Sequence, residues 1–196
     1  MVIKRIAVGP LATNCYVVSC DGDAFIIDPG DDVQTIRDYI KKNNLNVQFI
    51  INTHSHIDHI KADRALGYPV YIHRADAPAL KDVSKNHSRL ILGSFEPCKP
   101  AKVLEDGDEI EFCGKKIKVL HTPGHTVGGI CLALDKVVFT GDTLFRDGVG
   151  RTDLPDGSER DILNAIRKKL LCLDDDVTIY PGHGEASTIG RERGNF

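Results

Sequence analysis

Apolar and polar positions alternate in short blocks along the chain, and turn residues separate the blocks. Near the N-terminus, short apolar runs predict three strands, at residues 3–8, 15–19 and 24–27. The turn Asp28-Pro29-Gly30 ends the third strand. Apolar residues at helical spacing then predict a helix over residues 33–42, for which Asp31 and Asp32 are candidate N-caps.

The same reading continues through the middle of the chain. It predicts a strand around Phe49, a helix over residues 61–66 and a strand over residues 70–72. Residues 82–102 have little regular period and are predicted to form a loop.

Two hairpins and a helix are predicted in the second half. The hairpins pair residues 109–112 with 116–120 and residues 130–134 with 137–140. Ser158 is a candidate cap for an amphipathic helix whose apolar face contains Ile162, Leu163, Ile166, Leu170 and Leu171. Antiparallel groups of strands with interspersed helices indicate a mixed α/β fold of two sheets with outer helices.

Composition narrows the class of protein. The 196 residues are 41% hydrophobic and 27% charged, which is typical of one globular domain, here spanning residues 1–196. A net charge of −3 gives no basic field for nucleic acid, and no apolar stretch approaches the ~18 residues of a membrane span. The six cysteines form no C-x-x-C pair, which favours reduced thiols and a cytoplasmic protein. The oligomeric state is not predicted.

The densest group of potential metal ligands is the segment Thr53-His54-Ser55-His56-Ile57-Asp58-His59. His54 and His56 alternate with Ser55, so both imidazoles point to one side of extended backbone. Asp58 and His59 begin a predicted helical turn and can be directed at a second point nearby. Divalent metals such as zinc take histidine nitrogen and carboxylate oxygen. The spacing therefore favours ligands for two adjacent metals; the alternative is a polar helix N-terminus with solvent-facing histidines.

Three later apolar runs also lead through a glycine or proline turn to a residue that can bind metal. These residues are His125, Asp142 and His183. If all four strands ended at one sheet edge, their side chains would converge on a single cleft. The repetition is harder to explain by chance than any single motif.

These motifs resemble the metallo-β-lactamase superfamily, and within it the short, single-domain glyoxalase II-like (hydroxyacylglutathione hydrolase-like) hydrolases. The hallmarks T-H-x-H-x-D-H, T-P-G-H-T, G-D-T-L-F and Y-P-G-H-G occur here in the family's order, at residues 53–59, 122–126, 141–145 and 180–184. The resemblance covers nearly the whole chain. It implies an α/β fold, the αβ/βα four-layer sandwich of two mixed β-sheets flanked by helices.

The resemblance also implies a ligand set and a reaction. His54, His56 and His125 would hold one metal ion, Asp58, His59 and His183 a second, and Asp142 would bridge them. The two divalent ions, expected to be zinc with iron or manganese as alternatives, would share a hydroxide that attacks a carbonyl carbon. Asp58 would also act in catalysis by orienting the hydroxide. The expected substrates are small acyl-thioesters of the S-lactoylglutathione type.

The chain departs from full-length glyoxalase II in its substrate-binding regions. No helical C-terminal domain is expected, and the family's C-G-K-F-Y segment is replaced by Val149-Gly150-Arg151-Thr152-Asp153. Arg151 falls on the Lys position and is predicted to bind a substrate carboxylate. The alternative is an internal salt bridge to Asp153 or Asp156.

Two other functions and one further residue stay open. The Gly-Arg-Thr-Asp segment is also similar to persulfide dioxygenases, which use one iron, and a non-enzymatic metal-binding scaffold is the other alternative. Asp28 is predicted to orient a ligand imidazole without binding the metal itself. Its alternative role is to cap the Pro29-Gly30 turn.

Overall fold

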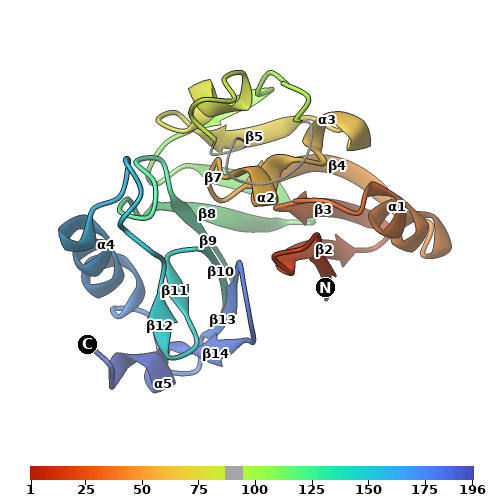
Figure 1. The fold of residues 1–196 in the computed structure, drawn as a ribbon. Coiled ribbons are helices and arrows are strands. Elements are labelled where there is room, and N and C mark those ends of the chain that lie inside the picture. The colour runs from red at the N-terminus through yellow and green to blue at the C-terminus, as the bar shows by residue number, and fades with distance from the viewer. Residues whose placement is uncertain (87–94) are drawn as a thin grey trace. The chain divides into compact units, whose positions relative to one another are not determined.

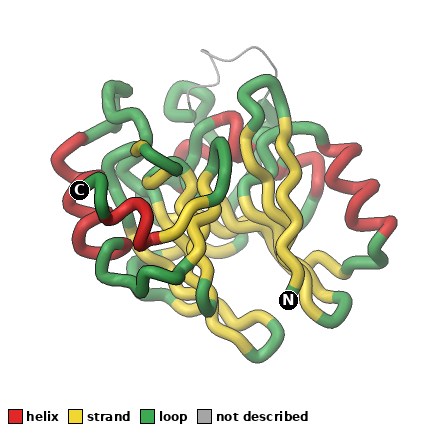
Figure 2. Tube along the Cα trace, turned by 90° about the horizontal axis from the view of Figure 1, so that it is seen from below, coloured by secondary structure: helices red, strands yellow, loops and turns green. Residues whose placement is uncertain are grey.

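The computed structural model describes residues 1–86 and 95–196, and the chain divides into two compact units, Met1–Val103 and Leu104–Phe196. Figure 1 shows the order of the elements along the chain. Each unit contains its own sheet, and helical segments lie beside the strands of each (Figure 2). Two mixed sheets with helices confirm the predicted α/β class. That the whole chain forms one domain stays a prediction.

The first sheet is mixed, in the order β1-β2-β3-β4-β5-β6. β1, β2 and β3 are antiparallel, whereas β3, β4 and β5 run parallel. Parallel neighbours end at the same edge, so the residues after β3, β4 and β5 lie together there. The bounds are β1 Val2–Val8, β2 Thr13–Cys20, β3 Asp23–Ile27, β4 Asn46–Asn52, β5 Val70–His73 and β6 Lys102–Leu104.

Helices of the first unit cover this sheet through an apolar core. In α1 (Val33–Lys42), Ile36 and Ile40 lie one turn apart and pack against strand residues such as Ile26 and Ile50. Burying each isoleucine contributes roughly 1.5–3 kcal/mol. The predicted bounds of α1 are confirmed, and Asp32 occupies the predicted N-cap position, but neither aspartate side chain bonds to the helix end. Asp32 accepts from the Gly9 N–H and Asp31 from Lys61 Nζ.

Of the helix predicted over residues 61–66, the structure forms α3 (Asp63–Leu66), and a separate short helix, α2 (Ile57–Ile60), precedes it. The break has a clear cause, because the Ala62 N–H donates to the Pro29 carbonyl at 3.0 Å. A 3-10 turn, η1 (Ala77–Leu80), follows β5. Residues 82–86 and 95–101 contain no helix or strand, as predicted, whereas Lys102 already belongs to β6. Residues 87–94 of the predicted loop lie outside the described residues.

The second sheet has the order β14-β13-β10-β9-β8-β7. β13 runs parallel to β10, and β8 and β10 are each antiparallel to β9. Consequently β8, β10 and β13 all end at one edge of this sheet. The bounds are β7 Glu109–Phe112, β8 Lys115–His121, β9 Ile130–Leu134, β10 Val137–Gly141, β13 Thr178–Pro181 and β14 Ser187–Thr188.

The expectation that all four ligand-bearing strands share one sheet edge is therefore wrong. β4 belongs to the first sheet, and β8, β10 and β13 belong to the second. Strand pairing is decided by which apolar faces cover one another, and the apolar runs alone did not distinguish the two sheets.

Ser158 begins the predicted amphipathic helix, and its Oγ accepts from the Asp161 N–H at 3.3 Å. The helix consists of α4 (Glu159–Ala165) followed by a π-helical turn, η2 (Ile166–Leu170). Ile162, Ile166 and Leu170 are buried in the core of the second unit, which confirms a packing role.

Two C-terminal features were not predicted, a small hairpin and a short helix. The hairpin is β11 (Leu144–Phe145) with β12 (Gly148–Val149), and the helix is α5 (Ile189–Arg193). The buried carboxylate of Glu192 accepts from the Asp147 N–H at 2.9 Å and from Ser187 Oγ. Arg191 also binds both Asp147 oxygens at 2.9 Å. These bonds attach α5 to the hairpin that follows Asp142.

None of the helices in residues 1–86 and 95–196 combines the length and the apolar character that crossing a bilayer requires.

A buried carboxyl group links β4 to α3. Asp63 is 1% exposed, and its Oδ2 accepts from Asn52 Nδ2 at 2.5 Å. Burial raises the pKa of Asp63 well above its ordinary value, and the Asn52 hydrogen bond offsets only part of this shift. Asp63 therefore keeps its proton to higher pH in the native protein than in the unfolded chain.

Asp63→Asn should remove a pH-dependent cost of folding. In the wild-type protein this group's contribution to stability is fully present below the unfolded pKa, near 4. It declines as pH rises toward the raised native pKa, by up to about 1.4 kcal/mol per pH unit. Urea unfolding of both proteins between pH 4 and 8 should show Asp63→Asn gaining relative stability with pH. A difference that stays constant with pH would contradict the assignment.

Candidate metal centre

The loop after β4 brings three imidazoles together in the first unit. The ring centroids of His54 and His56 are 4.7 Å apart, and those of His54 and His59 are 4.1 Å apart. His56 has extended backbone and directly precedes α2, which carries Asp58 and His59. All three rings are buried. Side chains from a strand end and a helical turn thus meet, as the spacing predicted.

Asp28 orients two of these rings from the end of β3. Its Oδ2 lies 2.9 Å from His59 Nδ1 and accepts from Thr53 Oγ1 at 2.6 Å, and its Oδ1 accepts from the Thr53 N–H at 2.7 Å. A carboxylate only accepts, so Nδ1 of His59 carries the proton. The Thr53 hydroxyl gives its proton to Asp28 and therefore accepts from His54 Nδ1 at 3.2 Å. Both rings keep a lone pair on Nε2, as metal ligation requires.

The turn Asp28-Pro29-Gly30 also fits closely against α2. A Cβ on Gly30 would lie 1.5 Å from the carbonyl oxygen of Asp58, so no other residue fits without displacing α2. The Asp58 carboxylate is held from another side, because its Oδ2 accepts from Thr13 Oγ1 at 3.0 Å. Asp58 Oδ2 lies 3.5 Å from His59 Nε2.

In the second unit, His125 lies in the loop after β8. Its Nδ1 donates to the carbonyl oxygen of Arg151 at 2.8 Å, which leaves the lone pair on Nε2. The loop depends on Gly124, whose φ is +136° and whose Cβ, if present, would lie 2.3 Å from the Ile162 nitrogen of α4. The T-P-G-H-T segment thus packs its glycine on α4 and holds the histidine in a defined orientation.

Asp142 follows β10 and lies between two histidines. Its Oδ2 is 3.5 Å from His125 Nε2 and 3.6 Å from His183 Nε2. Phe145 packs edge-on against the His183 ring, with centroids 6.3 Å apart. A Cβ on Gly150 would lie 1.8 Å from the Asp142 carbonyl oxygen. Only glycine therefore lets the backbone after β12 pass this close to Asp142. The same oxygen of Asp142, Oδ2, faces both histidines.

The recurring separation of about 3.5 Å has a chemical meaning. It occurs between Asp58 and His59, between Asp142 and His125, and between Asp142 and His183. Such pairs are too far apart for a good N–H···O hydrogen bond. Two atoms that each bind one zinc ion at about 2.0–2.1 Å with tetrahedral geometry lie about 3.4 Å apart. The residues therefore fit divalent metal ions on the evidence of their own geometry.

The Arg151 side chain forms the salt bridge that the sequence offered as its alternative role. Its Nε and Nη2 donate to the two oxygens of Asp153, both at 2.8 Å. The pairing lowers the pKa of Asp153 to about 2. Both side chains are exposed, so substrate binding by Arg151 stays a prediction.

Three residues that contact the ligand loop were not singled out from the sequence. Thr53 relays a hydrogen bond from His54 to Asp28, and Thr13 holds Asp58. Asp76, after β5, accepts from the Ser55 N–H at 2.9 Å. Their positions after or within neighbouring strands were the only available signal. His121, by contrast, bonds to the Val127 carbonyl rather than to Asp142.

Sequence comparisons identify the family of the chain. The family profile described as the metallo-beta-lactamase superfamily matches residues 8–183. An uncharacterized protein of Mycobacterium tuberculosis is 42% identical over 213 residues, covering 98% of this chain and 95% of the relative. Hydroxyacylglutathione hydrolase GloC of Haemophilus influenzae is 34% identical over 202 residues, with coverage of 98% and 95%.

Solved structures give the same result. The B3 metallo-beta-lactamase BLEG-1 matches with a TM-score of 0.90 and 34% identity, covering 98% of this chain and 97% of its own. TTHA1623 in a di-iron-bound form matches with a TM-score of 0.86 and 33% identity, covering 97% and 96%. ETHE1 from Myxococcus xanthus matches with a TM-score of 0.81 and 26% identity, covering 98% and 82%. The ligand motifs, the fold and these relatives together show that the chain belongs to the metallo-β-lactamase superfamily of metal-dependent hydrolases.

Proposed function

We propose that this protein is a binuclear metal-dependent hydrolase of small acyl-thioesters, acting in the cytoplasm. The observation that carries the proposal is the set of aspartate–histidine pairs held about 3.5 Å apart, with the imidazole protons directed away from the metal-facing nitrogens. The proposed ligands are His54, His56, Asp58, His59, His125, Asp142 and His183.

Two divalent ions held by these residues would lower the pKa of bound water toward about 7, which supplies a nucleophile at neutral pH, and would polarise a carbonyl oxygen. The protein's own residues supply orientation. Thr13 holds one oxygen of Asp58, so that this carboxylate can accept a hydrogen bond from the attacking water and align it. Asp28 and the Arg151 carbonyl keep His59 and His125 in the tautomers that ligate metal.

The substrate class rests on chemistry and on a relative. A thiolate is a good leaving group and needs little acid assistance, which agrees with the lack of a separate acid among the proposed site residues. One relative, 34% identical, is named hydroxyacylglutathione hydrolase GloC. Hydroxyacylglutathione is a thioester. Because BLEG-1, also 34% identical, is a B3 metallo-beta-lactamase, β-lactams belong in the substrate panel.

Zinc is the proposed metal, with iron and manganese as alternatives. Histidine and carboxylate ligands accept all three, so availability decides among them. The di-iron form of TTHA1623 makes iron the first alternative. A persulfide dioxygenase would need one iron and no second metal, whereas the close Asp58–His59 pair favours a second occupied position. A scaffold without activity would bind metal and turn over nothing.

Elemental analysis together with hydrolysis assays tests the proposal. The purified protein should contain two divalent ions per chain and release free thiol from S-lactoylglutathione and related acyl-thioesters. One iron with oxygen uptake on glutathione persulfide would instead establish the dioxygenase. Bound metal without turnover on thioesters, β-lactams or persulfides would establish the scaffold.

Asp142→Ala should reduce both metal content and hydrolysis. Loss of residues that only orient a ligand costs about 10–100-fold, so loss of the shared ligand should cost more than about 100-fold in kcat/KM. Asp156→Ala, an exposed carboxylate after the same hairpin, is the matched control and should behave as wild type. Full metal content in Asp142→Ala would refute the bridging role.

Asp28→Asn should weaken metal binding without removing a ligand. The amide can donate to His59 Nδ1, which moves the ring proton to Nε2 and blocks ligation. Competition with a chelator should show a loss of about 10–100-fold in affinity. Asp76→Asn is the control, since Asp76 also anchors the loop through a backbone N–H. An equal loss in both variants would assign Asp28 to loop packing.

Arg151→Ala should raise KM for a thioester that carries a carboxylate, with kcat and metal content unchanged. Metal content should not change, because His125 bonds to the backbone of Arg151 and not to its side chain. Asp153→Ala removes the same ion pair but keeps the guanidinium, so its KM should not rise. If both variants lose thermal stability equally and neither changes KM, the pair is structural.

A further inference from the structure

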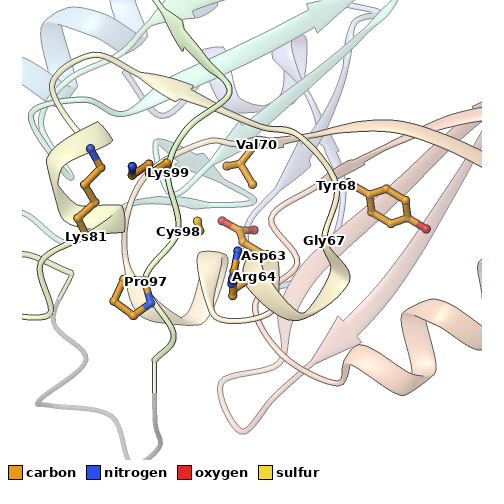
Figure 3. Close-up of a pocket in the computed structure, with 9 residues that line it drawn as sticks. All are labelled: Asp63, Arg64, Gly67, Tyr68, Val70, Lys81, Pro97, Cys98 and Lys99. Carbon is orange, nitrogen blue, oxygen red and sulfur yellow. The ribbon is translucent and has the colours of Figure 1, made fainter.

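A cavity lies within the first unit, and none of its lining residues is a proposed metal ligand. It has a volume of about 440 Å³ and is shown in Figure 3. That volume lies in the range of small-molecule sites. Its lining comes from α3, the start of β5, the residue after η1 and the segment before β6. The lining residues are Asp63, Arg64, Gly67, Tyr68, Val70, Lys81, Pro97, Cys98 and Lys99.

Two polar side chains of the lining, Asp63 and Cys98, are shielded from solvent and have raised pKa values. Asp63 uses Oδ2 to bind Asn52, while its Oδ1 is buried and has no hydrogen-bond partner among the described residues. Burial raises the pKa of this carboxyl group, which favours its neutral form. Burial and the nearby Asp63 raise the pKa of Cys98 to about 12, so its sulfur is a thiol rather than a nucleophilic thiolate.

Three cations also line this cavity. Arg64, Lys81 and Lys99 are exposed, and within residues 1–86 and 95–196 their side chains have no ion pair or hydrogen bond. Figure 3 shows Lys81 and Lys99 on one side of the cavity and Arg64 beside Asp63 and Cys98. Asp63 is the one acidic residue among the lining residues. The cavity therefore has an excess of positive charge in a protein whose net charge is −3.

Three other lining residues contribute apolar atoms from different sides of the cavity. Val70 is 4% exposed, and Pro97 and Tyr68 also line the cavity. A ligand with one strongly anionic group and a small organic part would satisfy both regions. A phosphate monoester carries about −1.5 to −2 charges at neutral pH and three acceptor oxygens, and it matches several cations better than a single carboxylate does. Arginine with lysines is a common phosphate-binding combination.

We propose that this cavity binds a small organic phosphate. The phosphoryl group lies among Arg64, Lys81 and Lys99, and the organic part lies against Val70, Tyr68 and Pro97. No proposed metal ligand lines this cavity, so phosphate binding here is independent of the proposed hydrolase activity.

Isothermal titration calorimetry with glycerol 3-phosphate and AMP tests the proposal, with glycerol, adenosine and succinate as controls. The double variant Arg64→Ala/Lys99→Ala should lose at least about tenfold in affinity for the phosphates, the cost of about one charge-assisted hydrogen bond. Lys41→Ala/Lys42→Ala removes the same charge from exposed positions of α1 and should change affinity less than about twofold. Asp142→Ala should bind the phosphates as wild type does.

Four results would overturn the proposal. They are no heat from either phosphate at millimolar concentration, equal losses in the two double variants, or succinate binding as tightly as the phosphates. The fourth is binding lost in Asp142→Ala but kept in the cavity variant, because it would place the phosphate at the metal centre.

Discussion

The carboxylate of Asp28 is the interaction on which the ligand loop of the first unit depends. It accepts from His59, from the Thr53 hydroxyl and from the Thr53 backbone, and through Thr53 it also sets the proton of His54. An imidazole ligates metal only through a nitrogen that has no proton, so the chemistry requires a defined tautomer. One acceptor at the end of β3 imposes that tautomer on two rings from the neighbouring strand end.

In each unit, backbone segments approach one another very closely beside the proposed ligands. Gly30 lies against the Asp58 carbonyl, Gly124 against α4 and Gly150 against the Asp142 carbonyl, and a Cβ at any of the three would collide with its neighbour. Each glycine therefore positions a ligand rather than merely ending a strand. The turn that contains Gly30 also explains why the helix is interrupted between α2 and α3. The Ala62 N–H donates to the Pro29 carbonyl instead of forming a helical hydrogen bond.

In the second unit, a backbone carbonyl group sets the tautomer of a proposed ligand. A carbonyl oxygen, that of Arg151, fixes the His125 tautomer, and Asp142 presents one oxygen to two imidazoles. Glu192 and Arg191 of α5 hold the hairpin between Asp142 and Arg151. A C-terminal element that touches no proposed ligand thus stabilises the segment that carries one of them and orients another.

The α/β class and most strands and helices could be predicted from the sequence alone, because period and turn residues are local signals. The proposed ligand residues could also be selected from it, because metal-binding side chains cluster after apolar runs. It did not determine which strands share a sheet, since the apolar runs before all four motifs are alike and pairing depends on distant faces. It also could not identify Thr13 or Asp76, whose contacts bridge 45 and 21 residues of sequence. The sequence offered the local Arg151–Asp153 pair as one of two roles for Arg151. It could not show that the side chains of Asp31 and Asp32 bind Lys61 and the Gly9 N–H, partners 30 and 23 residues away, instead of the helix end. The cavity around Asp63 had no local signal at all, because it is formed by residues that lie up to 36 positions apart and that only folding brings together.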